Sequence, residues 1–298
     1  MGVLTKLEVI VNADVTDISD NVLAIHLQND GFGIPDVERY EQTGPLQDGS
    51  TDLGFKLNPR SIQIVVNMLA RSVAEYWQNR DTLLYLFTPR VEPIQLRFTR
   101  PDEKVRQIDC HYVGGLTFPS QDKQAYVGHR VGIQLRANDP TFYDPVTKSE
   151  SLGIAVTTST FTLPLSLPWN IGSNSLNSSV PILYSGTYVT HPIITVYGPV
   201  ADLIITNTTT GDKLDFTGHT ITAGKVYTID TRYGYKTVTD ELGTAHLDKL
   251  TSDSDLSTFS FVPRPAAPGG INTLSVSGTG ATTATNIYIS YYERYIGV

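Results

Sequence analysis

The stretch that divides this chain is RANDPTFYDP, residues 136–145. It holds two Asp-Pro dipeptides, and Phe142 and Tyr143 lie between them. Because proline fixes its own φ and keeps the preceding residue out of the helical region, the stretch is expected to be extended and stiff. A convincing helical pattern precedes it and none follows. The stretch is therefore predicted to join two domains, and the alternative is a loop whose two aromatics fill a local gap.

Composition limits the class of protein. The chain has 298 residues, of which 40% are hydrophobic and 17% charged, which is typical of one large all-β domain or two medium ones. The formal net charge is −8, and no run of Lys or Arg is long enough to form a basic patch. Proteins that grip phosphate backbones need clustered cations, so specific nucleic-acid binding is not expected.

Cysteine content and hydropathy restrict the setting. Cys110 is the single cysteine, which excludes an intramolecular disulfide and a cysteine zinc site. The N-terminal MGVLTKLEVI lacks the long apolar core of a signal peptide, and no window approaches 18 apolar residues. Neither a secretion signal nor membrane insertion is therefore expected.

The first half shows strand patterns separated by turn signals. Short β-branched or alternating runs predict strands at Leu7–Val11, Arg60–Met68, Ile94–Thr99, Val105–Val113 and His129–Leu135. Asn29–Pro35 carries the Asp-Gly signal of a hairpin turn.

One helix is predicted over residues 72–87. Ser72 followed by Glu75 forms a capping box, and proline at 89 ends the pattern. Apolar residues from 73 to 87 follow the three-to-four spacing of one helical face. Tyr76 and Trp77 are therefore predicted to be core residues; the alternative for Trp77 is stacking on a sugar or a base.

After residue 150 short strands recur at intervals of about ten residues. Runs rich in Val, Ile, Thr and Tyr, separated by Gly, Asn and Pro, are typical of a β-sandwich or jelly roll. The Ser/Asn-rich segment 170–179 is expected to be an exposed loop. Ile287–Ile296 is predicted to be one closing strand. Its tyrosines, at 288, 291, 292 and 295, could form a sugar-stacking platform, although on an alternating strand half of them are expected to be core.

No pattern in the chain indicates catalysis. The six histidines lack the i, i+4 spacing of a helical zinc site, serine lacks a Gly-x-Ser-x-Gly elbow, and Cys110 and His111 point to opposite faces of a strand. A pair of carboxylates can always be drawn among 30 acidic residues, so drawing one proves nothing. We predict no catalytic, cofactor-binding or metal-ligating residue and no cofactor.

The order and spacing of several turn and strand motifs resemble the distal tail protein family of long, non-contractile bacteriophage tails. Segments that carry the resemblance are Asp30–Gly33, Pro45–Gly49, the strand led by Arg60, Ala74–Arg80, Asp139–Pro145, Asn207–Leu214, Ile221–Asp230, Pro268–Leu274 and Ile287–Tyr292. The segments 170–179 and 239–257 are longer and more polar than this family leads us to expect.

The resemblance implies a fold and a domain division. It implies an N-terminal β-sheet or split-barrel domain with the one helix, over 1–138, and a C-terminal galectin-like β-sandwich over 146–298. The junction is then 139–145, and its structural residues are Asp139, Pro140, Phe142, Tyr143 and Pro145. Phe142 and Tyr143 are expected to pin the two domains at a fixed angle.

The resemblance also implies a structural, non-enzymatic virion protein. It implies a homo-hexameric ring at the distal end of the tail, assembled in the host cytoplasm, between the tail tube protein and the tail hub or fibre protein. DNA is expected to pass through the lumen of this acidic ring without specific binding. Two rivals stay open, a lectin-like domain that binds host surface glycans and a cell-wall hydrolase.

Overall fold

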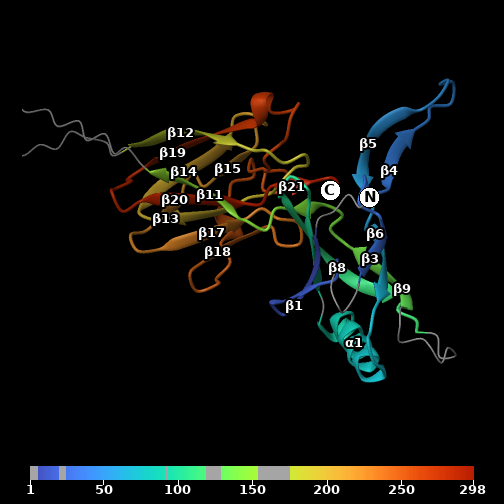
Figure 1. Ribbon diagram of the computed structural model, residues 1–298. Helices are drawn as coiled ribbons and strands as arrows, with labels where there is room; N and C mark the ends of the chain where they lie inside the picture. Colours follow the sequence, from blue (N-terminus) through green and yellow to red (C-terminus); the bar gives the residue numbers. More distant parts are fainter. Residues whose placement is uncertain (1–5, 20–24, 92, 119–128, 154–174) are drawn as a thin grey trace, which may run out of the picture. The chain divides into compact units, whose positions relative to one another are not determined.

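The protein consists of two compact units. The computed structural model describes residues 6–19, 25–91, 93–118, 129–153 and 175–298. Unit 1 comprises Met1–Pro145 together with Tyr295–Val298, and unit 2 comprises Val146–Arg294. Figure 1 shows the order of their elements along the chain.

Unit 1 is built on an antiparallel sheet with the order β2-β1-β7-β8-β9-β6-β3, to which β10 and β21 are added. Its strands are β1 (Lys6–Val11), β2 (Asp14–Asp17), β3 (Ile25–Asp30), β6 (Arg60–Met68), β7 (Ile94–Thr99), β8 (Val105–Gly114), β9 (His129–Ala137), β10 (Phe142–Tyr143) and β21 (Arg294–Tyr295). The predicted strands at 7–11, 60–68, 94–99, 105–113 and 129–135 are confirmed to within two residues at their ends. Strict alternation made them readable, because every second side chain of β6, β7 and β9 is buried.

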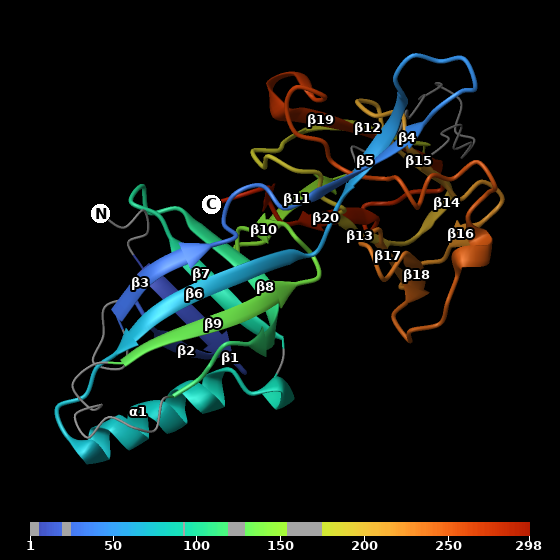
Figure 2. The ribbon, with the colours of Figure 1, turned by 90° about the vertical axis from the view of Figure 1, so that its right-hand side faces the viewer.

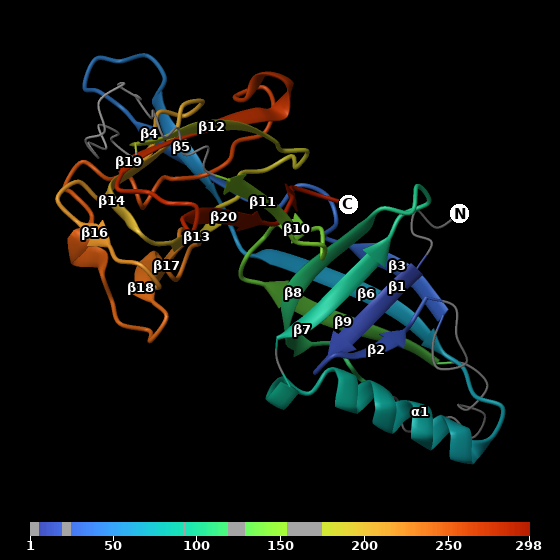
Figure 3. The same cartoon turned by 90° about the vertical axis from the view of Figure 1, so that its left-hand side faces the viewer.

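The sheet of unit 1 is strongly curved. In Figures 2 and 3 the β1 and β7 side faces the β6 and β9 side, so their inward side chains share one core. The helix α1 (Val73–Leu86) crosses one end of this sheet and contributes Leu83 and Leu86 to the core. A 3-10 turn, η1 (Pro89–Val91), follows the helix.

Strands β4 (Val37–Gln42) and β5 (Thr51–Leu57) pair only with each other among the described strands. They form a separate two-stranded hairpin, which projects from the sheet of unit 1 in Figure 1.

Unit 2 is a β-sandwich. One sheet has the order β11-β20-β13-β17-β18, and the other has the order β12-β19-β14-β15 with β16 paired to β14. The strands are β11 (Lys148–Gly153), β12 (Ser175–Leu183), β13 (Ile193–Tyr197), β14 (Val200–Asn207), β15 (Lys213–Asp215), β16 (Thr220–Ile221), β17 (Val226–Asp230), β18 (Thr237–Asp240), β19 (Ile271–Thr279) and β20 (Asn286–Tyr291). The short 3-10 turns η2 (Leu247–Lys249) and η3 (Pro268–Gly270) lie between β18 and β19. Inward side chains of both sheets, among them Val196, Ile205, Val276 and Ile289, form one core. The mainly β fold with one α-helix is confirmed for the described residues.

Two sequence expectations are wrong in this half. Residues 175–179, expected in a loop, begin strand β12, and residues 170–174 lie outside the described residues. The closing strand predicted over 287–296 is two strands, β20 and β21. Strand β21 pairs with β10, and Tyr295–Val298 belong to unit 1, so the C-terminal domain does not extend to residue 298. Alternation predicts a strand but not the sheet that it joins.

Candidate functional site

The β4–β5 hairpin exposes apolar side chains on a pair of strands that nothing in the described chain covers. All six residues of β4 are exposed, and Phe55 and Leu53 are 57% and 60% exposed. Val37 lies opposite Leu57 and Arg39 lies opposite Phe55, so these side chains share one face. An isolated two-stranded hairpin is marginally stable in water, and its apolar face favours contact with a further protein surface.

The opposite face of the hairpin carries polar partners. Glu38 lies opposite Lys56, and Lys56 Nζ is 3.0 Å from the Glu38 carboxylate and 5.5 Å from the centre of the Tyr40 ring. On the face shared with Phe55, Arg39 forms a further exposed ion pair with Asp52 at 3.0 Å. These exposed pairs add little stability, so they do not replace a covering surface.

Arg60, the first residue of β6, connects four segments of unit 1. Its side chain is 2% exposed, and its guanidinium donates to the carbonyl oxygens of Pro140 at 2.7 Å and Ile296 at 2.6 Å. It also donates to the carbonyls of Gly31 and Gly33, at 2.5 and 2.6 Å. Burial lowers the pKa of Arg60 to about 10, which leaves the group charged at neutral pH. The planar fork of an arginine can satisfy several carbonyls at once, which a lysine cannot.

Gly31 is required beside Arg60. Its φ is +85°, and a Cβ at this position would lie 2.1 Å from the carbonyl oxygen of Ser61. Only glycine therefore lets the turn after β3 approach β6 closely enough to accept from Arg60.

The predicted junction residues lie in unit 1. Phe142 is fully buried in the core of unit 1, 5.8 Å from Phe98 between ring centroids and 4.7 Å from the Arg60 guanidinium. The Tyr143 hydroxyl bonds to Asp109 at 2.8 Å and accepts from Gln107 at 3.0 Å, both on β8. Both aromatics therefore lie within unit 1, as a core residue and a sheet residue, and their predicted role of holding the two domains at a fixed angle stays a prediction.

The other junction residues hold the turn that precedes β10. Asp139 Oδ1 accepts from the backbone N–H and the hydroxyl of Thr141, at 3.1 and 2.7 Å. Pro140 presents its carbonyl to Arg60, and Pro145 is the last residue of this part of unit 1.

The predicted helix cap is present, and one predicted core residue is not buried. The Ser72 side chain accepts from the backbone N–H of Glu75 at 3.2 Å, whereas the Glu75 carboxylate accepts from the N–H of Arg71 rather than that of Ser72. Tyr76 is 8% exposed and joins the core. Trp77 is 51% exposed, so its predicted core position is wrong. Its ring stacks under the Arg80 guanidinium at 4.8 Å, which covers one face of the indole.

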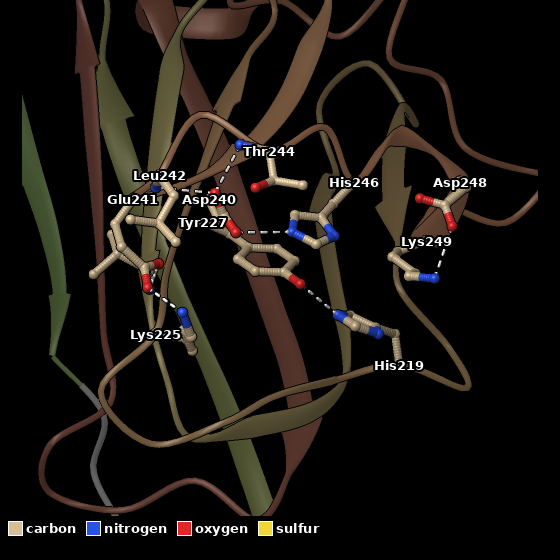
Figure 4. Close-up of polar contacts among 11 residues, drawn as sticks. His219, Lys225, Tyr227, Asp240, Glu241, Leu242, Thr244, His246, Asp248 and Lys249 are labelled. Atoms are coloured by element: carbon tan, nitrogen blue, oxygen red, sulfur yellow. Dashed lines mark hydrogen bonds and ion pairs between the residues drawn. The ribbon is translucent and has the colours of Figure 1, made fainter.

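Unit 2 holds a stack of aromatic and imidazole rings that the sequence did not reveal (Figure 4). Tyr227 lies between His219 and His246, with ring centroids 5.5 and 4.6 Å away and nearly parallel planes. The Tyr227 hydroxyl bonds to His219 Nε2 at 3.0 Å, and His246 Nε2 lies 3.2 Å from the Asp240 carboxylate. The three rings come from separate segments of the chain, so no local motif could have indicated them.

The charges around this stack are compensated. Burial opposes ionisation of Asp240, but hydrogen bonds from the N–H of Thr244, from His246 and from the N–H of Leu242 outweigh it and lower its pKa to about 2. Burial, followed by the nearby charges of Lys249 and His246, lowers the pKa of His219. Lys225 and Glu241 form an ion pair next to the stack, as Figure 4 shows. A paired, stacked cluster of this kind is a structural network, because each group is already satisfied within it.

Two properties of the described residues bear on catalysis. No group of three or more His, Cys, Asp or Glu that could hold a metal ion occurs among them. Burial raises the pKa of the Cys110 thiol, which disfavours the nucleophilic thiolate. In the same described part of the chain, no helix is long and apolar enough to cross a membrane.

Comparison with known proteins finds a likeness to phage tail proteins over part of the chain. Residues 22–128 match the family model described as the phage tail protein RIFT-related domain. No curated protein sequence matches the chain.

Solved structures extend the likeness over the whole chain. The crystal structure of the Dit protein of phage SPP1, described as a paradigm of the hub adsorption apparatus in phages that infect Gram-positive hosts, matches with a TM-score of 0.62 and 14% identity, covering 97% of this chain and 98% of that chain. Two structures of the phage p2 baseplate in its activated conformation, one with Sr and one with Ca, each match at a TM-score of 0.47 and 8% identity over 96% of this chain and 97% of theirs. The resemblance to siphophage distal tail proteins is therefore confirmed by the domain match and by the shared fold with SPP1 Dit.

Proposed function

We propose that this protein is a non-enzymatic structural component of a phage tail, which forms a homo-hexameric ring at the distal end of the tail tube. The phage tail domain of residues 22–128 and the fold shared with SPP1 Dit support a tail hub component. In this proposal the ring connects the tail tube protein to the tail hub or fibre protein. The protein resides in the virion after assembly in the host cytoplasm.

The observation that carries ring formation is the exposed β4–β5 hairpin. A hairpin with an uncovered apolar face needs a partner surface, and in a cyclic ring that surface is supplied by the next subunit. Such an interface is heterologous, because the hairpin of one subunit meets a different surface of its neighbour. Each subunit then both offers and receives one hairpin.

Charge supports passage of DNA through the ring without binding. The chain carries a formal net charge of −8, and a channel lined by such subunits repels the phosphate backbone. A lumen lined mainly by Lys and Arg in the assembled ring would contradict this part of the proposal.

Deletion of the hairpin tests ring formation. Val37 and Leu57 are cross-strand partners, so residues 38–56 can be replaced by Gly-Gly without a change in the flanking chain. The variant is expected to keep the thermal stability of the full chain and to lose assembly in size-exclusion chromatography with light scattering. Assembly that survives the deletion would place the interface elsewhere.

The second candidate function is glycan binding by unit 2. The exposed rings of Tyr197 and Tyr288, on the outer face of one sheet, favour it. This function is compatible with a ring, because a hub at the tail tip can also touch the host surface.

A further inference from the structure

The outer face of the sheet β11-β20-β13-β17-β18 carries a row of hydroxyl groups. Because side chains alternate along each strand, residues that are cross-strand partners share one face. The strand registers align one hydroxyl-bearing side chain from each of the five strands, namely Ser151, Tyr288, Thr195, Thr228 and Thr239. We call these five residues the hydroxyl row. All five are exposed or half-buried, whereas their sequence neighbours Leu152, Ile287, Val196, Ile229 and Val238 are in the core.

Two tyrosines make this face unlike an ordinary polar sheet surface. Tyr288, in the row, is 44% exposed, and Tyr197, on the adjacent strand β13, is 39% exposed. Their ring centroids are 5.6 Å apart at 80°, so the edge of one ring supports the face of the other. Tyr197 lies opposite Asn286, which adds an amide beside the two rings.

The face offers almost no net charge to a ligand. Its one acidic residue within the strands is Asp230, which pairs with Arg232 through contacts of 2.7, 3.0 and 3.2 Å. The hydroxyl row itself contains no group that ionises near neutral pH. An anionic polymer would find no unpaired cation in the row, and a charged peptide would find no complementary group.

The other sheet of unit 2 provides an internal comparison. Its outer face also has aligned hydroxyls, Ser179, Ser275 and Thr206, but the row ends at Lys213. Strands β12, β14, β15, β16 and β19 contain no aromatic residue. Aligned hydroxyls therefore occur on the outer faces of both sheets, whereas exposed tyrosines occur only on the strands of the sheet β11-β20-β13-β17-β18.

We propose that the hydroxyl row, with Tyr197 and Tyr288, binds an uncharged polysaccharide. A sugar presents a C–H face that packs on an aromatic ring and hydroxyls that both donate and accept, which matches tyrosine rings flanked by Ser and Thr hydroxyls. Adjacent strands are about 4.8 Å apart, close to the repeat of a pyranose in an extended chain. A linear glycan that crosses the strands would thus meet a hydroxyl at each strand. The site gives the second candidate function a location and does not depend on ring formation.

Calorimetric titration of the full chain tests the proposal. The probes are cellohexaose, maltohexaose and a galactohexaose, with poly(glycerol phosphate) as the charged probe. At least one uncharged probe is expected to bind saturably with millimolar affinity or better, and Tyr288→Ala and Tyr197→Ala are each expected to weaken that binding by about tenfold or more. Tyr288→Phe keeps the ring and is expected to stay within about threefold of the unchanged chain, because stacking is retained. Ser275→Ala, on the other sheet, is the matched control and is expected to have no effect.

Several results would overturn the proposal. They are absence of saturable binding to every uncharged probe, binding that survives both alanine substitutions, or binding of the charged probe alone. The face would instead be a protein interface if it bound another tail protein and no sugar. In that case both alanine substitutions would abolish binding of the tail protein. The mass of each variant in solution is recorded in parallel. If a variant loses sugar binding but keeps the mass of the unchanged protein, the sugar site is independent of the proposed ring.

Discussion

At the scale of single residues, Arg60 has the most consequential position in unit 1. Replacement by Met removes four charge-assisted donors and leaves the carbonyls of Gly31, Gly33, Pro140 and Ile296 without them. Arg60→Met is expected to lower the free energy of unfolding by about 3 kcal/mol or more, because buried carbonyls left unsatisfied are costly. Urea unfolding of the full chain measures this change in the free energy of unfolding. The matched control is Arg100→Met, which breaks the exposed ion pair with Asp102 and is expected to cost about 0.5 kcal/mol or less.

His219 is expected to make the stability of unit 2 depend on pH. The pKa of His219 is lowered in the folded chain. At a pH between this lowered pKa and the ordinary pKa of histidine, the unfolded chain therefore binds more protons than the folded chain. The contribution of neutral His219 to the free energy of unfolding is therefore fully present above about pH 6.5 and is lost as the pH falls below that value. We expect His219→Gln to reduce the drop in the urea midpoint between about pH 7.5 and about pH 5.5. An equal drop in both proteins would show that other groups cause it.

At the scale of elements, the helix cap is a local feature that sequence alone predicted. Ser72→Ala is expected to lower the free energy of unfolding by about 1 kcal/mol, because the N–H of Glu75 loses its acceptor. Ser72→Asp keeps an acceptor at the same place and is expected to stay near the stability of the unchanged chain. If both substitutions destabilise equally in urea, the cap is not the cause.

Local patterns predicted local features, and contacts between distant segments escaped them. The strands of both units follow from alternation, because burial of one face imposes a period of two. The prediction for Trp77 was wrong because residue spacing on a helix does not show how wide the buried face is. Trp77 lies outside that face, and the Arg80 guanidinium covers its indole ring. The β4–β5 hairpin was not predicted either, because the sequence of β4, VERYEQ, does not alternate apolar and polar residues.

At the scale of the whole molecule, the last four residues return to unit 1. Tyr295 is 8% exposed in the core of unit 1, and the N–H of Val298 donates to the carbonyl of Phe32 at 3.1 Å. Unit 1 is therefore complete only when residues 295–298 are present. The sequence indicated a strand here, but pairing of β21 with β10 joins residues about 150 positions apart, which no short pattern reveals.

Removal of residues 295–298 tests this return. The truncated chain is expected to lose about 3 kcal/mol or more of the stability of unit 1, because a buried aromatic and an acceptor of Arg60 are lost. Hydrogen exchange of backbone amides in β6 and β8 is expected to accelerate, with unchanged exchange in β13 and β17. Accelerated exchange in both units alike would mean that the four residues do not act on unit 1 selectively.

In the proposed assembly the chain forms a ring through its exposed β4–β5 hairpin. Electron microscopy of the purified full chain, with light scattering on the same sample and on the hairpin-deleted variant, tests it most directly. We expect six-fold rings with a central hole and a mass six times that of the 32.7 kDa chain, and monomers for the variant. Rings of the same size formed without the hairpin, or monomers alone from the full chain at high concentration, would contradict it.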